Sequence, residues 1–429
     1  MSSLMLGCEQ KHFKTERQIT HDSYNHDLDN NDNFSPDDQW LVYDTRTEKG
    51  GIGANGKIEK VHIETGEKVV LYVVEGQTEH GPGVGAVSYS HTKNEVVFIH
   101  GLLNCSADKP YAQWRRIGVI VRDSAPGIPI FMDARNISAP FTPGALRGGT
   151  HRHEWSGDGQ WIGFTYNDAL MKTREDSTGI AYNLRTIGVS KAGRKVSIAK
   201  NNEGENISGD WFSALVVNVI PDPALGSDEI SRAAGDSWVG VSGYKKRDGT
   251  RQRARAFIGT TKSSEGKNID EVFIVDIPED ISIANENEPL EGTATTFPSP
   301  PKGTVQRRLT YTADTKYPGC EGIVRSSHDG SKLAFLAYDD QNIKQVFTIS
   351  PLGGTPVQQT FHPSDVESGV RWHPSENRIC YVWNGIIARL KIGEKKADIL
   401  TRPSKQPATS PVWSHDGKTI AYNRLVTDD

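Results

Sequence analysis

Several features that define other protein classes are scarce in this sequence of 429 residues. No apolar run approaches the roughly 18–20 residues that a transmembrane helix needs. The formal net charge is −5 and no basic stripe stands out, so we expect no nucleic-acid partner. No GxSxG segment marks the nucleophile of a serine hydrolase. These absences argue against a membrane-spanning protein, a nucleic-acid-binding protein and a peptidase of that type.

Cysteine is also rare, and no two cysteines form a CxxC pair, so the spacing indicates neither a disulfide framework nor a zinc ribbon. The four are Cys8, Cys105, Cys320 and Cys380. The segment 4–8, Leu-Met-Leu-Gly-Cys, looks like the end of a bacterial lipoprotein signal. We therefore expect residues 1–12 to be a leader or tether. Cys8 would then be lipidated and the protein secreted, periplasmic or on the cell surface. An ordinary unstructured N-terminus is the alternative.

Long helical patterns are scarce too, whereas 42 glycines and 22 prolines suit many tight turns. One motif recurs: an aromatic residue, then Ser-x-Asp-Gly, then a short apolar run rich in strand-forming residues. The copies are Phe34–Asp38, Tyr89–His91, Trp155–Gly159, Ser327–Gly330, Trp372–Pro374 and Trp413–Gly417, with a degenerate copy at Asp236–Val241.

The motif has a simple physical meaning. Asp-Gly or Pro-Asp turns the chain between two antiparallel strands, the aromatic residue packs between neighbouring units, and the apolar run is the second strand. The last copies recur at the period of a four-stranded propeller blade. We predict an all-β fold in which residues 13–429 form a single seven-bladed β-propeller. We expect the protein to be a monomer. The segment Arg17–Thr20 would join the last blade and close the ring.

Polar residues gather at two kinds of position that meet on one face of such a ring: the loop before the first strand of a blade and the end of its second strand. Alignment of the repeats puts His100 and Tyr166 at equivalent strand ends. Tyr244 falls near the same position one blade further on, and Arg185 lies one strand beyond Tyr166. With His80 from a loop, these residues form the predicted catalytic centre.

This set of side chains suits β-elimination from a uronic acid. Arginine neutralises the carboxylate, which acidifies the C5 proton; a histidine or tyrosine removes that proton, and another protonates the leaving glycosidic oxygen. Hydrolysis would need a pair of carboxylates, and no obvious pair stands at these strand ends. The expected substrate is an anionic polysaccharide, and this reaction requires no cofactor. A tyrosine at a strand end is, however, more often structural than catalytic.

The segment 147–153 supports two further expectations. Arg147, His151 and His153 could bind substrate. Because residues i and i+2 of a strand share a face, His151 and His153 could also hold a metal ion with a third ligand such as His80. Cys320 and His328 could belong to a structural zinc site. A structural Zn or Ca ion is thus a possible addition.

The repeats resemble the TolB-like propeller repeat over nearly the whole chain. The segments 26–46, 97–101, 146–151 and 164–168 resemble a bacterial propeller family catalogued as a domain of unknown function. The chain also resembles the short, seven-bladed ulvan lyases, polysaccharide lyase family twenty-five. That resemblance implies elimination next to glucuronic or iduronic acid by two histidines, matching His80 and His100, with tyrosine and arginine. Tyr166, Arg185 and Tyr244 match by type and order, and Tyr182 competes with Tyr166.

Three functions stay open at this point: a polysaccharide lyase, a non-catalytic TolB-like binding propeller, and a metal-dependent enzyme of the oligogalacturonate-lyase kind that uses His151 and His153. The lyase hypothesis predicts that His80, His100, Tyr166 and Arg185 line one open groove. The binding hypothesis predicts that these side chains are dispersed or buried. The metal hypothesis predicts histidine ligands within about 2.0–2.2 Å of an ion.

Overall fold

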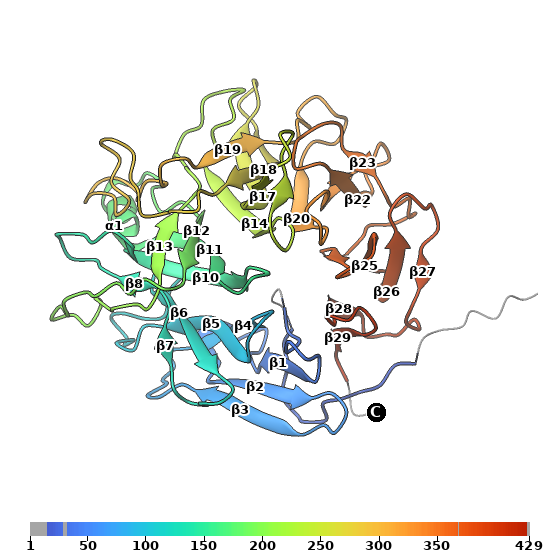
Figure 1. Ribbon diagram of the computed structural model, residues 1–429, viewed down its shortest axis with the longest axis horizontal. Helices are drawn as coiled ribbons and strands as arrows, with labels where there is room; N and C mark the ends of the chain where they lie inside the picture. The colour runs from blue at the N-terminus through green and yellow to red at the C-terminus, as the bar shows by residue number, and fades with distance from the viewer. Residues whose placement is uncertain (1–14, 29–31, 368, 427–429) are drawn as a thin grey trace, which may run out of the picture.

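The computed structural model describes the chain except for residues 1–14, 29–31, 368 and 427–429. Cys8 and the predicted lipid anchor therefore lie outside the described residues. Seven main sheets with antiparallel neighbours follow one another along the chain and lie around a common centre (Figure 1). The all-β prediction is confirmed. Among the described residues, no helix is long and apolar enough to cross a membrane.

The first sheet contains β1 (Trp40–Asp44), β2 (Lys57–His62) and β3 (Lys68–Val73). Five four-stranded sheets follow: β4 (Val84–Tyr89), β5 (Glu95–Gly101), β6 (Arg116–Arg122), β7 (Ile130–Phe131); β10 (Gly148–Trp155), β11 (Trp161–Asp168), β12 (Thr186–Lys191), β13 (Phe212–Leu215); β14 (Arg232–Trp238), β17 (Ala254–Lys262), β18 (Asn268–Asp276), β19 (Val305–Arg308); β20 (Cys320–Ser326), β21 (Leu333–Tyr338), β22 (Lys344–Ile349), β23 (Val357–Gln358); β24 (Arg371–Trp372), β25 (Arg378–Trp383), β26 (Ile386–Lys391), β27 (Asp398–Ile399). The last sheet pairs β28 (Ala408–Trp413) with β29 (Ile420–Arg424). Smaller elements are η1 (Ile52–Ala54), β8 (Ala134–Arg135), β9 (Ala145–Leu146), α1 (Ala169–Thr178), β15 (Tyr244–Lys245) and β16 (Arg251–Gln252).

The Ser-x-Asp-Gly motif forms the turn between the first two strands of a sheet, as predicted. In the β10–β11 turn, the Ser156 hydroxyl donates to Asp158 Oδ1 at 2.5 Å and accepts the amide of Trp161 at 3.0 Å. Asp158 Oδ1 also accepts the amide of Gln160 at 3.0 Å. The same serine–aspartate bond recurs in three further turns, at Ser35–Asp37, Ser327–Asp329 and Ser414–Asp416. The motif is therefore a hydrogen-bonded clamp around the turn.

This clamp gives a first testable prediction. Ser156→Ala should lower the free energy of unfolding by about 1–2 kcal/mol, because the buried Trp161 amide loses its acceptor. Urea unfolding of both proteins measures the difference. Ser282→Ala is the control, since the Ser282 hydroxyl donates to Asp280 at an exposed site and should change stability by less than about 0.5 kcal/mol. Equal losses in the two variants would contradict the clamp.

The aromatic residue of the motif joins neighbouring sheets, also as predicted. The Trp155 indole donates to the Ser88 carbonyl of the preceding sheet at 3.3 Å. The Trp372 indole does the same to the Arg325 carbonyl at 2.9 Å, and the ring of Trp155 is 1% exposed. The hydrophobic core is accordingly divided into clusters, most of which lie between adjacent sheets. The first strands of these sheets contact one another around the centre, and we call β4, β10, β14, β20, β24 and β28 the inner strands.

Five of the inner strands contain a bulge with one residue of positive φ. The register shifts in β4, β10, β14, β20 and β28. The residues concerned are Ala86, Arg152, Gly235, Gly322 and Ser410, with φ of 54°, 50°, 63°, 83° and 52°. A bulge adds one residue to one strand and so breaks the alternation of side chains between the two faces. Side-chain directions along an inner strand therefore cannot be counted as i, i+2.

The two ends of the described chain pack together, but the predicted closing strand is not found. Val412 and Ala421 of the last sheet share a hydrophobic cluster with Leu28 and Phe34. Arg17–Thr20, however, forms no strand, and β29 pairs only with β28 within the described part of the chain. The guanidinium of Arg17 bonds instead to the carbonyl of Ile63 and to Glu64 in the loop between β2 and β3. No described strand pairing closes the ring.

Candidate functional site

The inner strands run in the same direction, which defines two faces of the molecule. We call the face where they begin, near Gly148 of β10 and Arg232 of β14, the loop face. The face that carries the Ser-x-Asp-Gly turns is the turn face. The amide of Ala233 donates to the Arg185 carbonyl at the loop face, and the Trp238 indole donates to the Glu154 carbonyl near the turn face.

Two of the predicted catalytic residues are buried inside the sheets. His100, on β5, is 1% exposed and its Nε2 lies 3.0 Å from the hydroxyl of Tyr72. Burial lowers the pKa of His100. Tyr166, on β11, is also buried, and its hydroxyl donates to Asp168 Oδ2 at 2.9 Å. Burial, followed by the Asp168 charge, raises the pKa of Tyr166 well above its ordinary value. Neither side chain lines an open groove.

Tyr244 lies on the opposite face from the rest of the predicted set. It follows β14, whose last residue Trp238 pairs with Arg255, so it belongs to the turn face. Its hydroxyl donates to Asp276 Oδ1 at 2.9 Å and accepts from the Arg307 guanidinium at 2.8 Å. The repeat alignment placed it at a strand end, but the structure puts it at a strand beginning. The predicted five-residue centre is therefore not assembled.

Arg147 is committed to an internal ion pair. Its guanidinium lies 2.7 Å from Asp168 Oδ2, and both side chains are about fully buried. Asp168 also accepts the amide of Met171 and so caps the start of α1. Arg147 further donates to the carbonyls of Thr293 and Thr296. The expectation that Arg147 binds substrate is wrong in this conformation, because its donors are already used inside the fold.

The expected metal pair His151–His153 is separated by the β10 bulge. Arg152 lies between them with φ of 50°, so the two imidazoles do not share a face as a regular strand would require. His151 contacts Arg116 and Asn167, whereas His153 Nε2 lies 3.0 Å from Thr150 Oγ1. Among the described residues, one group of three metal-ligating side chains is found, and it contains neither His151 nor His153.

The proposed zinc pair of Cys320 and His328 is also wrong. Cys320 begins β20, whereas the exposed His328 follows its end, in the turn. At roughly 3.3 Å per residue, eight residues of extended chain separate them by about 20 Å or more. The Cys320 thiol is buried and lies 3.9 Å from Glu271 Oε2. Burial raises the pKa of this thiol.

A different group of side chains forms the candidate site on the loop face. The Arg116 guanidinium donates to His151 Nδ1 at 2.8 Å, which leaves His151 Nε2 to donate to Asn167 Oδ1 at 3.2 Å. Arg185 Nε donates to the same Asn167 oxygen at 3.3 Å. Arg116 and Arg185 are only half-buried. We call this set, with Tyr111, the arginine site.

The arginine site carries an excess of positive charge. Among the described residues, neither Arg116 nor Arg185 has a carboxylate within ion-pair distance. Burial, followed by the charges of Arg232 and Arg116, lowers the pKa of Arg185 to about 10. Burial, followed by the charges of Arg116 and Arg185, holds the pKa of His151 well below its ordinary value, so this imidazole is neutral. The unused guanidinium donors suit a bidentate anion such as a carboxylate.

Tyr111 adds a hydroxyl group to this site. Its ring lies 4.8 Å from the Arg116 guanidinium, and its hydroxyl has no hydrogen-bond partner among the described residues. Burial raises the pKa of Tyr111 to about 12, against the opposing charges of Arg116 and Arg46. The phenol is thus protonated at neutral pH. The backbone carbonyl of His80 accepts the Tyr111 amide at 2.8 Å, and the half-exposed His80 imidazole lies 3.6 Å from Glu79.

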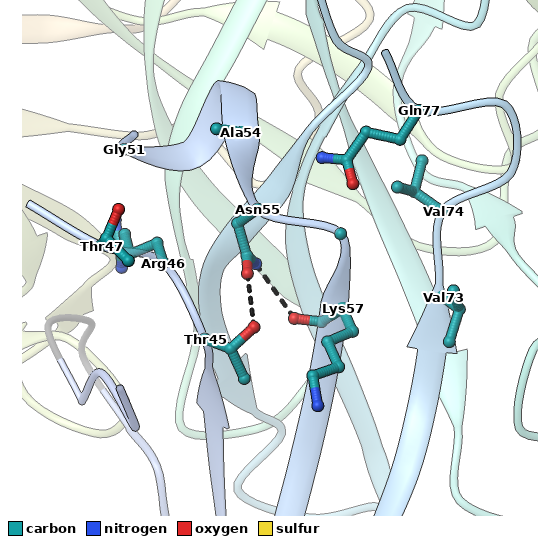
Figure 2. Close-up of a pocket in the computed structure, with 11 residues that line it drawn as sticks. Thr45, Arg46, Thr47, Gly51, Ala54, Asn55, Lys57, Val73, Val74 and Gln77 are labelled. Atoms are coloured by element: carbon teal, nitrogen blue, oxygen red, sulfur yellow. Dashed lines mark hydrogen bonds between the residues drawn. The ribbon is translucent and has the colours of Figure 1, made fainter. Parts of the chain in front are cut away.

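A pocket of about 340 Å³ opens beside Arg46 on the first sheet (Figure 2). Its lining includes Thr45, Asn55 and Lys57, and Asn55 is held by the Thr45 hydroxyl and the Lys57 carbonyl. Arg46 pairs with Asp44 at 2.9 Å and with Asp27 at 3.1 Å, so the pocket is polar. The positive charge of Arg46 also acts on Arg116, so the pocket adjoins the arginine site. A second pocket, of about 580 Å³, lies between the fourth and fifth sheets and is lined by Arg232, Cys320 and other residues.

The fold and this site define an all-β protein of antiparallel sheets with an arginine-rich face. The chain belongs to the family of YidR: it is 38% identical over 414 residues to "Uncharacterized protein YidR" of Escherichia coli (strain K12), covering 95% of this chain and 94% of that protein. A family model described as "Protein of unknown function (DUF3748)" matches residues 83–206. These findings confirm the expected bacterial family of unknown function.

Solved structures with similar sheets include TolB from Acinetobacter baumannii and an oligogalacturonate lyase from Vibrio parahaemolyticus. The TolB match has 12% identity and a TM-score of 0.38, and covers 89% of this chain and 73% of that chain. The lyase match has 13% identity and a TM-score of 0.42, and covers 83% and 74%. At these values neither structure carries an argument about function. The resemblance to ulvan lyases stays a prediction.

Sequence reasoning identified His151 and Arg185 but missed Arg116, Asn167 and Tyr111. Arg116 begins the third strand of its sheet, a position that the repeat alignment did not consider. Asn167 directly follows Tyr166, so the functional strand end was located one residue too early. A signal was present in the pair Arg115-Arg116 at the start of an apolar strand with no nearby acidic residue in sequence.

Proposed function

We propose that the seven sheets form a closed seven-bladed propeller that recognises uronic acid residues of an anionic polysaccharide at the arginine site. The observation that carries this proposal is the presence of two half-buried guanidinium groups, Arg116 and Arg185, without a carboxylate partner in the described part of the chain. Half-buried arginine is costly to leave unpaired, so a site with two of them favours an anionic ligand.

We further propose that the bound uronate undergoes β-elimination. Arg116 and Arg185 pair with the carboxylate, which acidifies the C5 proton. The His80 imidazole accepts this proton, the C4–O4 bond breaks as the C4–C5 double bond forms, and the Tyr111 hydroxyl donates its proton to the leaving O4. Burial raises the pKa of Tyr111 to about 12, so the hydroxyl is protonated at neutral pH and has a proton to donate. His80 and Tyr111 take these roles because His100 and Tyr166 are buried inside the sheets.

Binding without cleavage is the second candidate function. The burial of His100 and Tyr166 favours it, because both side chains belong to the catalytic centre that the sequence predicts. The two functions share the arginine site and differ only in whether His80 and Tyr111 act on the ligand. A location outside the cytoplasm, with Cys8 as a lipid anchor, and a monomeric state belong to the same proposal.

One experiment separates these outcomes. Purified full-length protein is incubated with ulvan and oligogalacturonate. The ultraviolet absorbance of the unsaturated uronate reports elimination, and affinity electrophoresis in the same polymers reports binding. We expect Arg116→Met and Arg185→Met to lose both signals. Tyr111→Phe should keep binding but lose elimination by about 100-fold or more. Arg122→Met is the matched control, because Arg122 lies on the same strand with a solvent-exposed side chain.

The results have distinct meanings. Binding without any rise in absorbance, lost in Arg116→Met, would support the binding function and reject the lyase. Elimination that persists in Tyr111→Phe and His80→Gln would reject the assigned acid and base. Binding that is the same in Arg116→Met, Arg185→Met and the wild type would reject the arginine site altogether.

A further inference from the structure

Three side chains from distant parts of the sequence meet on the turn face, opposite the arginine site. Asp32 lies in the segment that leads to β1, His91 in the β4–β5 turn and His415 in the β28–β29 turn. Their ligand atoms all lie within 4.8 Å of one another. The first, second and last sheets therefore each contribute one side chain to the same point.

The geometry is centred on one carboxylate oxygen. Asp32 Oδ2 lies 2.8 Å from His91 Nδ1 and 3.1 Å from His415 Nε2. Asp32 is buried, whereas the side chains of His91 and His415 are 33% and 28% exposed. The two imidazole rings stand edge to face with centroids 5.7 Å apart. Solvent can thus reach the cluster from the histidine side.

A fourth residue fixes the orientation of His415. Asp38 Oδ1 lies 2.8 Å from His415 Nδ1, and Asp38 also accepts the backbone amides of His415 and Asp416 at 2.7 and 2.9 Å. Since Nδ1–H of His415 donates to Asp38, Nε2 is the ring atom that is directed at Asp32. A carboxylate behind a histidine is the usual outer partner of a metal-bound imidazole.

We propose that Asp32, His91 and His415 bind a divalent transition-metal ion of the zinc type. Two nitrogens and one carboxylate oxygen are ligands that zinc prefers, and the fourth position would be taken by water. Tetrahedral ligands at about 2.0–2.1 Å from zinc lie about 3.4 Å apart, so small side-chain movements suffice.

The position of the site suggests what it does. The last sheet has two strands among the described residues, and no strand pairing connects it to the first sheet. A metal ion held by Asp32 and His415 would join the segment before β1 to the last turn of the chain. It would stabilise the contact between the two ends of the chain, independently of any ligand at the arginine site.

The test uses the full-length chain, stripped with EDTA and titrated with Co²⁺, whose visible absorption reports tetrahedral nitrogen and oxygen ligation. We expect one Co²⁺ per chain, displacement by Zn²⁺, and a higher midpoint of thermal unfolding with Zn²⁺. His91→Gln, His415→Gln and Asp32→Asn should lose both effects. His328→Gln is the matched control, since His328 occupies the same position of an equivalent turn and lies outside the cluster.

Each alternative result overturns a defined part of the proposal. If the wild type binds no Co²⁺, or if the His91 and His415 variants bind it as the wild type does, the metal site is wrong and the cluster is only a hydrogen-bonded ion pair. If Co²⁺ binds at this site but Zn²⁺ leaves the unfolding midpoint unchanged, the stabilising role is wrong. Asp32→Asn keeps the shape and hydrogen bonding of the cluster, so its circular dichroism separates loss of metal from loss of fold.

Discussion

Arg147→Met should lower the free energy of unfolding by about 3–5 kcal/mol, the largest effect that we expect from a single substitution. Arg147 and Asp168 form a buried pair at 2.7 Å, and Asp168 also holds the Tyr166 hydroxyl and the first turn of α1. Removing the guanidinium leaves a carboxylate buried without its cation, and that carboxylate would have to take up a proton. Urea unfolding, followed by circular dichroism, measures the loss.

Arg116→Met provides the comparison. Arg116 is half-buried like Arg185, and no carboxylate pairs with it in the described part of the chain. Its replacement should change stability by less than about 1 kcal/mol, while abolishing polysaccharide binding. A loss in Arg116→Met as large as in Arg147→Met would mean that Arg116 is structural and would weaken the functional assignment.

The stability of the protein should fall with acid in a way that depends on His153. Burial, followed by the charge of Arg116, lowers the pKa of His153 to about 3, whereas an unfolded histidine titrates near 6.5. Between these values the unfolded chain binds the proton and the folded chain does not. The contribution of this residue is therefore complete above about pH 6.5 and is lost by roughly 1.4 kcal/mol for each pH unit below it.

His153→Gln should remove this dependence, so the stability of the wild type relative to the variant should fall from about pH 7 to about pH 5. Asp133 acts in the opposite sense: burial raises its pKa to about 7, so its contribution falls as pH rises toward that value. The comparison of wild type with His153→Gln at each pH isolates the histidine. His328→Gln should leave the slope unchanged. Parallel pH profiles for the wild type and His153→Gln would contradict a buried, neutral His153.

The fold was predictable to a large extent because its signal is local. A serine, an aspartate and a glycine within five residues make the turn by themselves. The tryptophan before them packs between two sheets. The helix α1 was not predicted, although Asp168 at its start and Gly179 at its end are ordinary helix-capping residues. Its apolar periodicity is weak, with Met171 as the one buried side chain.

The candidate site was less predictable because it depends on facts that are not local. The directions of the His151 and His153 side chains are set by the positive φ of Arg152, and an arginine in the sequence gives no sign of a positive φ. Whether an arginine is free to bind depends on the distant carboxylate that meets it, as Asp168 meets Arg147. Tyr244 was assigned to the wrong face because the fourth repeat is degenerate and contains the extra strands β15 and β16.

The bulges of the inner strands have a mechanical consequence. Ser88 donates to the carbonyl of His153, within the β10 bulge, and Ser237 donates to the carbonyl of Val324, within that of β20. Neighbouring sheets are thus joined by hydrogen bonds at their inner edges, while the short outer strands β23 and β27 bond only within their own sheets in the described part of the chain. A molecule built in this way resists twisting near its axis and yields at its rim. Under force or heat, the outer strands should therefore separate from each sheet before the inner strands separate from one another.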